Sequence, residues 1–321
     1  MSKKPLILTP PIKDYIWGGT RLSKEFDMVS FTDRQAEAWV LSCHEAGHSI
    51  VENGEDKGKT LSEVIAEKGK ACLGTNCEKF SFFPILIKLI DARDNLSVQV
   101  HPDDEYAMRV EGEYGKTEAW YIMDCDEGAE IIYGFKKDIT KEEFRKSIEE
   151  NTLLDYVNRV KVKKGDIFFI EAGTLHAICK GILLAEVQQN SNTTYRVYDY
   201  GRLQNGKPRE LHVEKALDVT STKAIDASGK PMGETLKKDG YSETLLTSCE
   251  LFTMKRLDIE EKAAVVADST SFVSLVCLDG NGVVMHGDTC VTLYKGESVF
   301  IPASYGEVEI LGNLTVIESR V

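Results

Sequence analysis

The sequence predicts a mostly β protein divided into two related β-rich parts, with only a few short helices. Apolar runs of strand length are separated throughout by Gly, Asp and Asn, residues that favour turns. Few segments show the 3.6-residue apolar repeat of an amphipathic helix. A weak internal repeat relates the middle of the chain to its C-terminal part. At 321 residues, 42% of them hydrophobic, the chain is long enough for two folded domains.

Three segments carry helical patterns. The first covers residues 61–70. The second, 141–148, follows Thr140, and Thr140 with Glu143 forms a capping box, in which a Ser or Thr and a Glu three residues later exchange hydrogen bonds with the backbone. A third short helix is expected over 213–219.

A change of composition divides the chain. Residues 221–241 are rich in Ser, Thr, Lys, Gly, Pro and Asp and lack apolar periodicity, which indicates a connector. We therefore predict a first domain over 1–220 with small helical insertions and a second, degenerate β domain over 242–321. Strands are expected in the last part of the chain at 251–257, 272–278, 283–285, 290–293, 298–301 and 314–318.

The charge and the apolar segments limit the partners. Asp and Glu (52) outnumber Lys and Arg (39), which gives a net charge of −13 and argues against nucleic acid or an anionic membrane as a partner. The longest apolar stretch, residues 82–90, is too short to cross a bilayer, and the first residues show no segment of signal-peptide length. Eight cysteines without a Cys-x-x-Cys pair fit reduced thiols. These features predict a cytoplasmic protein.

The internal repeat is clearest when Gly165 is aligned with Gly296. Each copy reads as a glycine, an acidic residue, an apolar strand, a Pro or Gly turn and the start of the next strand. This pattern resembles the second sequence motif of cupin β-barrels, so we expect two related cupin-like barrels. His176 ends the first copy, whereas Glu307 takes its place in the second, and no His-x-His pair precedes Glu307. Only the first barrel is therefore expected to hold a metal ion.

Polar side chains that suit a metal ion precede His176 on two predicted strands. Gln99 and His101 lie two residues apart in an alternating segment and therefore share a face. Lys116 and Glu118 share a face in the same way at the start of a later strand. Two imidazoles and a carboxylate, with or without an amide oxygen, match the ligand preferences of Zn²⁺ and other first-row divalent ions. A position left for water or substrate would make the site catalytic.

A competing metal motif occurs at His44-Glu45-Ala46-Gly47-His48, which satisfies the His-Glu-x-x-His pattern of zinc peptidases. That pattern requires a helix that places both histidines on one face. Residues 37–43 instead alternate like a strand, a glycine lies inside the motif, and Asn53-Gly54 follows soon after. We therefore predict a strand end and a loop, and keep the zinc peptidase as the least favoured alternative.

Five motifs, in order, carry a resemblance to a known family. They are Tyr15-Ile16-Trp17-Gly18-Gly19, Gln99-Val100-His101-Pro102-Asp103-Asp104, Gly115-Lys116-Thr117-Glu118, Gly173-Thr174-Leu175-His176-Ala177 and Asn192-Thr193-Thr194-Tyr195-Arg196. Over most of residues 5–215 the sequence resembles the short bacterial form of the type I mannose-6-phosphate isomerases. The resemblance implies a cupin fold, one catalytic Zn²⁺ in the first barrel, and interconversion of mannose 6-phosphate and fructose 6-phosphate.

The resemblance also implies roles for the residues at matching positions. The metal ligands would be Gln99, His101, Glu118 and His176. Arg196 falls on the active-site arginine of the family and Lys116 on the lysine two residues before the ligand glutamate, so both are expected to be catalytic and to contact the substrate. Tyr15 and Trp17 are expected to line the substrate pocket, with an N-terminal strand that covers the barrel as the alternative. Larger family members carry this lysine in Asn-His-Lys-Pro-Glu, of which only Lys and Glu occur here, so the roles of the missing residues do not transfer.

The residues leave parts of the chemistry open. Moving a proton between C1 and C2 of a sugar phosphate passes through an enediol or enediolate, whose negative oxygens need a fixed positive partner such as Zn²⁺. Lys116, a carboxylate and a metal-bound hydroxide remain candidates for the base, and Arg196 suits either the enediolate or the phosphate group. A non-enzymatic cupin that binds a sugar phosphate is the second functional alternative. The expected assembly is a monomer or a weak homodimer.

Overall fold

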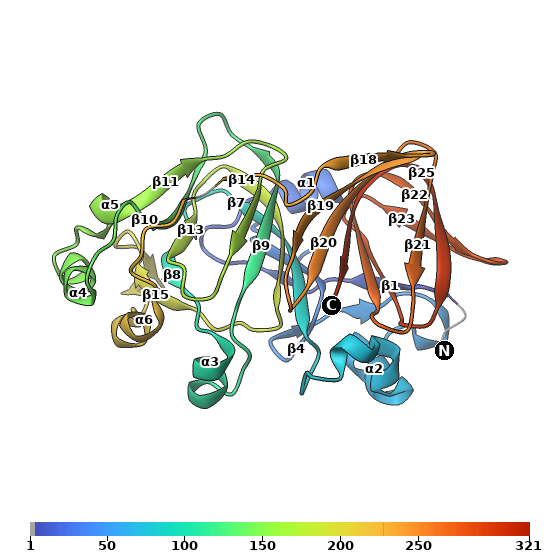
Figure 1. Cartoon of the computed structure of the whole chain (residues 1–321), viewed down its shortest axis with the longest axis horizontal. Helices are drawn as coiled ribbons and strands as arrows, with labels where there is room; N and C mark the ends of the chain where they lie inside the picture. The colour runs from blue at the N-terminus through green and yellow to red at the C-terminus, as the bar shows by residue number, and fades with distance from the viewer. Residues whose placement is uncertain (1–3, 227) are drawn as a thin grey trace.

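The computed structural model describes residues 4–226 and 228–321 and consists of two β bodies that lie side by side (Figure 1). The first body, here called the first barrel, is formed by a six-stranded and a five-stranded sheet. The second body, the second barrel, is formed by one ten-stranded sheet. The prediction of a mostly β fold with two barrels is confirmed.

The two sheets of the first barrel are antiparallel. The six-stranded sheet has the order β12-β9-β14-β7-β3-β2, with β2 (Ile12–Lys13), β3 (Glu37–Leu41), β7 (Ile85–Ala92), β9 (Glu118–Cys125), β12 (Ile167–Ile170) and β14 (Ile182–Gln189). The five-stranded sheet has the order β11-β10-β13-β8-β15, with β8 (Val98–Val100), β10 (Glu130–Phe135), β11 (Val157–Lys161), β13 (His176–Ile178) and β15 (Tyr195–Tyr198). Two small hairpins join β4 (Cys43–His44) to β5 (Gly47–His48) and β16 (Leu203–Gln204) to β17 (Lys207–Pro208).

Apolar side chains fill both faces of the six-stranded sheet. On β9, Trp120 and Ile122 point into the core between the two sheets of the first barrel. The alternate residues Tyr121 and Met123 pack in a second core that includes Phe300 and other side chains of the second barrel. One face of the six-stranded sheet therefore borders the interior of the first barrel. The second barrel buries the opposite face, which is called the rear face below.

The second barrel encloses a core of its own, in which Leu257, Leu275 and Ile310 are buried. Its sheet has the order β18-β19-β20-β25-β22-β24-β1-β6, with β21 beside β25 and β23 beside β22. The strands are β1 (Leu6–Thr9), β6 (Ile50–Val51), β18 (Thr235–Lys238), β19 (Tyr241–Ser248), β20 (Thr253–Ile259), β21 (Lys262–Ala267), β22 (Val273–His286), β23 (Thr289–Tyr294), β24 (Ser298–Ile301) and β25 (Gly306–Arg320).

Two features of this sheet differ from the predicted division at residues 221–241. Strands β1 and β6, from the N-terminal part, are hydrogen-bonded into the sheet of the second barrel. A strand pattern cannot reveal its partner, which explains why the sequence did not predict this pairing. Strand β18 lies inside the predicted connector, and all of its residues are exposed at the sheet edge, so no apolar pattern marks it.

The three predicted helices are present as α2 (Leu61–Lys68), α4 (Lys141–Glu149) and α6 (Val213–Val219). The capping box of Thr140 and Glu143 at the start of α4 is confirmed. Three other helices are too short to show an apolar period and were not predicted: α1 (Arg21–Phe26), α3 (Asp104–Val110) and α5 (Leu153–Tyr156). Single 3₁₀ turns occur at Gly54–Asp56, Lys70–Leu73 and Thr75–Cys77. Helices α4, α5 and α6 contribute to a core on the outer face of the five-stranded sheet.

The sequence repeat is also a structural repeat. Strands β12 and β24 each begin two residues after the aligned glycine, Gly165 or Gly296, and both glycines have positive φ angles of 92° and 89°. The acidic residue after each glycine accepts a hydrogen bond from the backbone N–H three residues before it, at 3.0 Å and 2.8 Å. The two copies therefore use the same tight turn to start the same kind of strand.

The segment with the peptidase-like motif is a hairpin and not a helix. His44 ends β4 and His48 ends β5, so the two histidines belong to paired antiparallel strands. The predicted strand and loop are confirmed, and this geometry excludes the zinc-peptidase reading. No helix among the described residues is long and apolar enough to span a membrane.

The two repeat glycines provide a matched test of the turn. Gly165→Ala is expected to lower the free energy of unfolding by about 1–2 kcal/mol, because an L-residue is strained at this positive φ although nothing lies within 4 Å of the new Cβ. Gly296→Ala is expected to cost more, because its Cβ would also lie 2.9 Å from Cβ of Phe26. Urea unfolding of both variants measures the difference, and equal losses would contradict this account.

Candidate active site

The first barrel contains a cavity of about 280 Å³ between its two sheets. The wall of the cavity is mostly polar, in contrast to the apolar core beside it. Eight of its side chains are charged or carry an amide: Glu37, Lys88, Gln99, Lys116, Glu186, Asn192, Arg196 and Arg209. The predicted pocket residues Tyr15 and Trp17 also border the cavity, with ring centroids 5.6 Å apart. Their contact with a substrate stays a prediction.

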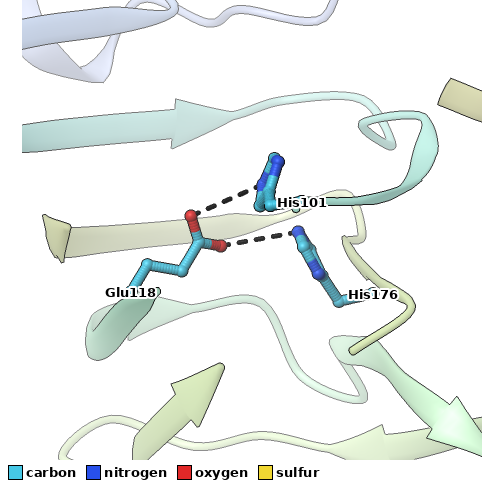
Figure 2. Close-up of side chains that lie close together, drawn as sticks. All are labelled: His101, Glu118 and His176. Carbon is cyan, nitrogen blue, oxygen red and sulfur yellow. Dashed lines mark ion pairs between the residues drawn. The ribbon is translucent and has the colours of Figure 1, made fainter. Parts of the chain in front are cut away.

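Three predicted metal ligands lie close together, as Figure 2 shows. The cluster adjoins the cavity through Gln99 and Lys116, which line the cavity and contact His176 and His101. His101 directly follows β8, Glu118 is the first residue of β9, and His176 is the first residue of β13. Nε2 of His101 lies 3.6 Å from Oε2 of Glu118, and Nε2 of His176 lies 3.4 Å from Oε1. All three side chains are buried, and their ligand atoms lie within 4.8 Å of one another.

Backbone carbonyls fix the orientation of both imidazoles. Nδ1 of His101 donates to the carbonyl of Thr193 at 2.9 Å, and Nδ1 of His176 donates to the carbonyl of Thr174 at 2.8 Å. Each Nε2 therefore presents a lone pair to the cluster when the ring is neutral. Burial lowers the pKa of His176 to about 4 and the pKa of His101 well below its ordinary value, so both rings are neutral at pH 7.

The carboxylate of Glu118 is the least satisfied group of the cluster. Burial and the nearby carboxylate of Glu186 raise the pKa of Glu118 to about 7. In the described part of the chain, no hydrogen bond of good geometry reaches either oxygen of Glu118. Nζ of Lys116 is the cation beside them, 2.9 Å from Oε2 of Glu118 and 3.1 Å from Nε2 of His101. The cluster is therefore a convergent set of acceptors that attracts positive charge.

These donors fit a divalent metal ion. Two neutral imidazoles and one carboxylate form the nitrogen and oxygen set found in catalytic metal sites, and the buried oxygens of Glu118 accept no hydrogen bond of good geometry from the described residues. An ion at the centre would supply positive charge next to the carboxylate, where Lys116 supplies it in this structure. Lys116 itself borders the cavity.

Gln99 lies at the edge of this cluster. Its strand position is directly opposite His176, and its Nε2 is 3.4 Å from Nε2 of that histidine. Its Oε1 accepts a hydrogen bond from Ser97 Oγ at 3.3 Å. Gln99 could join the ligands only after its amide rotates to bring the oxygen toward the imidazoles.

Arg196 borders the cavity from β15, where it is paired in register with Gln99 on β8. Its Nε donates to Ser97 Oγ at 3.2 Å and one terminal nitrogen donates to the carbonyl of Glu210 at 2.9 Å. Among the described residues, no carboxylate forms an ion pair with Arg196. Arg209, which also borders the cavity, is held instead by the carboxylate of Asp199. Arg196 therefore keeps its charge available for an anionic ligand.

The sequence suggested Lys88 only as a further phosphate contact and did not predict that it pairs with Glu186 in this wall. Lys88 of β7 and Glu186 of β14 are directly opposite each other, with Nζ 3.2 Å from Oε1, and Glu37 lies 3.5 Å from the same Nζ. Although burial disfavours the charged form of Lys88, the two carboxylates raise its pKa above the ordinary value. Indole N–H groups of Trp120 and Trp39 donate to Glu186 at 2.8 Å and to Glu37 at 2.7 Å. The sequence did contain a signal for this pair, because Lys88 and Glu186 are each a single charged residue within a long apolar run.

A tight turn brings Lys116 and Glu118 to the cluster. A Cβ on Gly115 would lie 2.5 Å from the backbone of Asp103, so only glycine fits there. Its N–H donates to Oδ1 of Asp104 at 2.7 Å, and the N–H of Lys116 donates to the carbonyl of Pro102 at 3.0 Å. These hydrogen bonds join the turn after His101 to the residues that precede β9. The motif that contains His101 and the motif that contains Glu118 therefore lie side by side.

Comparison with known proteins decides the family. The family description "Phosphomannose isomerase type I, catalytic domain" matches residues 6–144, and "Mannose-6-phosphate isomerase, cupin domain" matches residues 242–321. The mannose-6-phosphate isomerase ManA of Bacillus subtilis is 39% identical over 326 residues, which covers all of both chains. A mannose-6-phosphate isomerase of Streptococcus mutans is 39% identical over 99% of this chain and 98% of the relative.

The chain belongs to the type I mannose-6-phosphate isomerase family. The crystal structure of the Bacillus subtilis mannose 6-phosphate isomerase superimposes with a TM-score of 0.92 at 39% identity, over 99% of this chain and 100% of that one. A phosphomannose isomerase structure from Salmonella typhimurium, at 18% identity and a TM-score of 0.79, shares the fold. The predicted resemblance, the cupin-like barrels and the class of aldose-ketose isomerases are confirmed. The non-enzymatic cupin alternative is therefore wrong.

The number of protons released when a metal ion binds tests the charge states of Glu118 and His176 in this site of the mannose-6-phosphate isomerase family. Because the pKa of Glu118 is raised to about 7, this carboxyl binds a proton below pH 7 that an entering ion must displace, whereas His176, with a pKa of about 4, stays neutral. The affinity of the metal-free protein for Zn²⁺ should therefore rise roughly tenfold per pH unit up to pH 7 and then level off.

Calorimetry in buffers of different ionisation enthalpy measures this proton release directly. We expect about one proton per bound ion at pH 6 and almost none at pH 8. Release of two or more protons at pH 6 would mean that the imidazoles are charged before the ion binds, and would contradict the assigned charge states.

Proposed function

We propose that the chain interconverts mannose 6-phosphate and fructose 6-phosphate by moving a proton between C1 and C2 through an enediol or enediolate. The proposed cofactor is one Zn²⁺ bound by His101, Glu118 and His176, with Gln99 as a fourth ligand. The observation that carries the proposal is the buried cluster of two neutral imidazoles and a poorly satisfied carboxylate beside a polar cavity. When bound, the ion would polarise the sugar carbonyl and offset negative charge on the adjacent oxygens.

We propose that Lys116 transfers the proton: as the neutral amine it takes the proton from one carbon, and as the ammonium so formed it returns the proton to the other carbon. Its Nζ contacts both Glu118 and His101, and the same side chain borders the cavity, so it can reach a sugar whose reacting end faces the cluster. The carboxylates of Glu37 and Glu186 also border the cavity, but each is engaged by Lys88 and by a tryptophan N–H. Lys116 is therefore the proton carrier that the contacts favour.

We propose that Arg196 stabilises the negative oxygens of the enediolate. Its register position opposite Gln99 places it on the strand next to the proposed ligand set, and its guanidinium has no carboxylate partner in the described chain. A guanidinium with free N–H groups in a partly buried wall is a strong electrostatic partner for a developing oxyanion. A cytoplasmic location and a monomer or weak homodimer stay predictions.

Kinetics and solvent exchange of two variants test these roles. Lys116→Gln is expected to lower kcat by about 10²–10⁴-fold with little change in KM, and to slow deuterium incorporation from D₂O into the sugar phosphates by the same factor. Arg196→Gln is expected to lower kcat by about 10²–10³-fold. Metal content is determined for both variants as a control.

Each deviation from these results has a specific meaning. Unchanged exchange in Lys116→Gln would assign the proton transfer to another group. A change of KM alone in Arg196→Gln would assign this guanidinium to the phosphate. No turnover by the zinc-loaded wild-type protein would contradict the proposed function as a whole.

A further inference from the structure

The loop between α3 and β9 carries a carboxylate, Glu113, whose contacts all lie outside that loop. Its Oε2 accepts hydrogen bonds from Ser191 Oγ at 3.3 Å, from the N–H of Asn192 at 3.0 Å and from Thr193 Oγ1 at 3.2 Å. Three donors from consecutive residues thus meet on one oxygen, and bonds to a charged acceptor are the stronger kind. Glu113 therefore holds segment 191–193 in one conformation.

The segment that Glu113 holds belongs to the wall of the site. The carbonyl of Thr193 accepts the Nδ1–H of His101, which directs the lone pair of Nε2 toward Glu118. Asn192, next to Thr193, borders the cavity. A shift of this segment would therefore disturb both the aim of one imidazole and the shape of the cavity wall.

The second oxygen of Glu113 meets the hairpin that resembled a peptidase motif. Nε2 of His44 lies 3.4 Å from Oε1 of Glu113. Nδ1 of His44 accepts the N–H of Ala46 at 3.0 Å, so the proton of the neutral ring is on Nε2 and points at the carboxylate. The ring of His44 also packs edge-on against Trp39, which donates to Glu37 in the cavity wall. The hairpin thus contacts Glu113 at the carboxylate oxygen that segment 191–193 leaves free.

We propose that Glu113 is a positioning residue of the metal site, oriented by His44. It clamps segment 191–193 so that the carbonyl of Thr193 holds His101 in the rotation and tautomer needed for ligation. This inference rests on the proposed function, because it takes His101 to be a metal ligand. Groups that orient a ligand histidine commonly change metal affinity strongly when they are removed.

Two substitutions at Glu113 differ in what they remove. The alanine removes the acceptor oxygens, the charge and the volume, whereas the glutamine removes the charge and one acceptor oxygen but keeps the volume. Glu113→Ala removes the acceptor and leaves the N–H of Asn192 without its partner. Glu113→Gln keeps one oxygen for the three donors, but its amide N–H₂ would oppose the Nε2–H of His44. The matched control is Glu105→Ala, which removes an exposed carboxylate from the neighbouring helix α3.

The experiment measures Zn²⁺ affinity by competition with a colorimetric chelator, and the visible spectrum after loading with Co²⁺. We expect the Kd for Zn²⁺ to rise about 10–100-fold in Glu113→Ala and about 3–10-fold in Glu113→Gln, with no change in Glu105→Ala. The Co²⁺ spectrum should shift in Glu113→Ala, because the geometry at His101 changes. Far-UV circular dichroism checks that each variant is folded.

The outcomes distinguish this inference from the proposed function. A wild-type protein that binds no Zn²⁺ would overturn the metal site itself. Tight binding by the wild type together with unchanged affinity in Glu113→Ala, or an equal loss in Glu105→Ala, would overturn only the role of Glu113. If Glu113→Ala does not fold, an affinity of Glu113→Gln equal to that of the wild type overturns it.

Discussion

The burial of Glu118 between the sheets of the first barrel is the constraint on which the rest of this structure depends. A carboxylate removed from water without hydrogen bonds is costly, and its surroundings must supply compensating charge. Lys116 supplies part of it in the structure, and the two imidazoles face the same point. A bound cation, as in the proposed function, would complete the arrangement and would link stability and function at this residue.

The rigidity of the surrounding wall follows from the same constraint. The proposed metal ligands lie at the ends or starts of β8, β9 and β13, where short turns and backbone carbonyls fix them. The sheet that carries Glu118 is packed on its rear face by the second barrel, so neither face is free to move. The second barrel thus contributes to the site by packing, although its own copy of the repeat ends in Glu307 and not in a histidine.

Much of this arrangement could be predicted from the sequence, because its signals are local. The alternation of side chains along a strand predicted that Gln99 shares a face with His101, and Lys116 with Glu118. The glycine turn before β12 indicated the internal repeat. Other features depend on pairings that no local pattern encodes. The strand β1 joins the second barrel across more than half of the chain, and the edge strand β18 is entirely exposed. The ion pair of Lys88 and Glu186 forms only because β7 and β14 are neighbours in the sheet, and the sequence of neither strand indicates that neighbour.

The most direct test of the central claim is isomerisation of mannose 6-phosphate by protein stripped of metal with a chelator and measured again after addition of Zn²⁺. The account predicts that turnover is lost on stripping and restored by Zn²⁺ in the wild type. It predicts the same for His48→Ala, whose histidine lies in the hairpin and contacts Ser62, but no restoration in His176→Ala. Full turnover by the stripped protein, or restoration in His176→Ala, would contradict it.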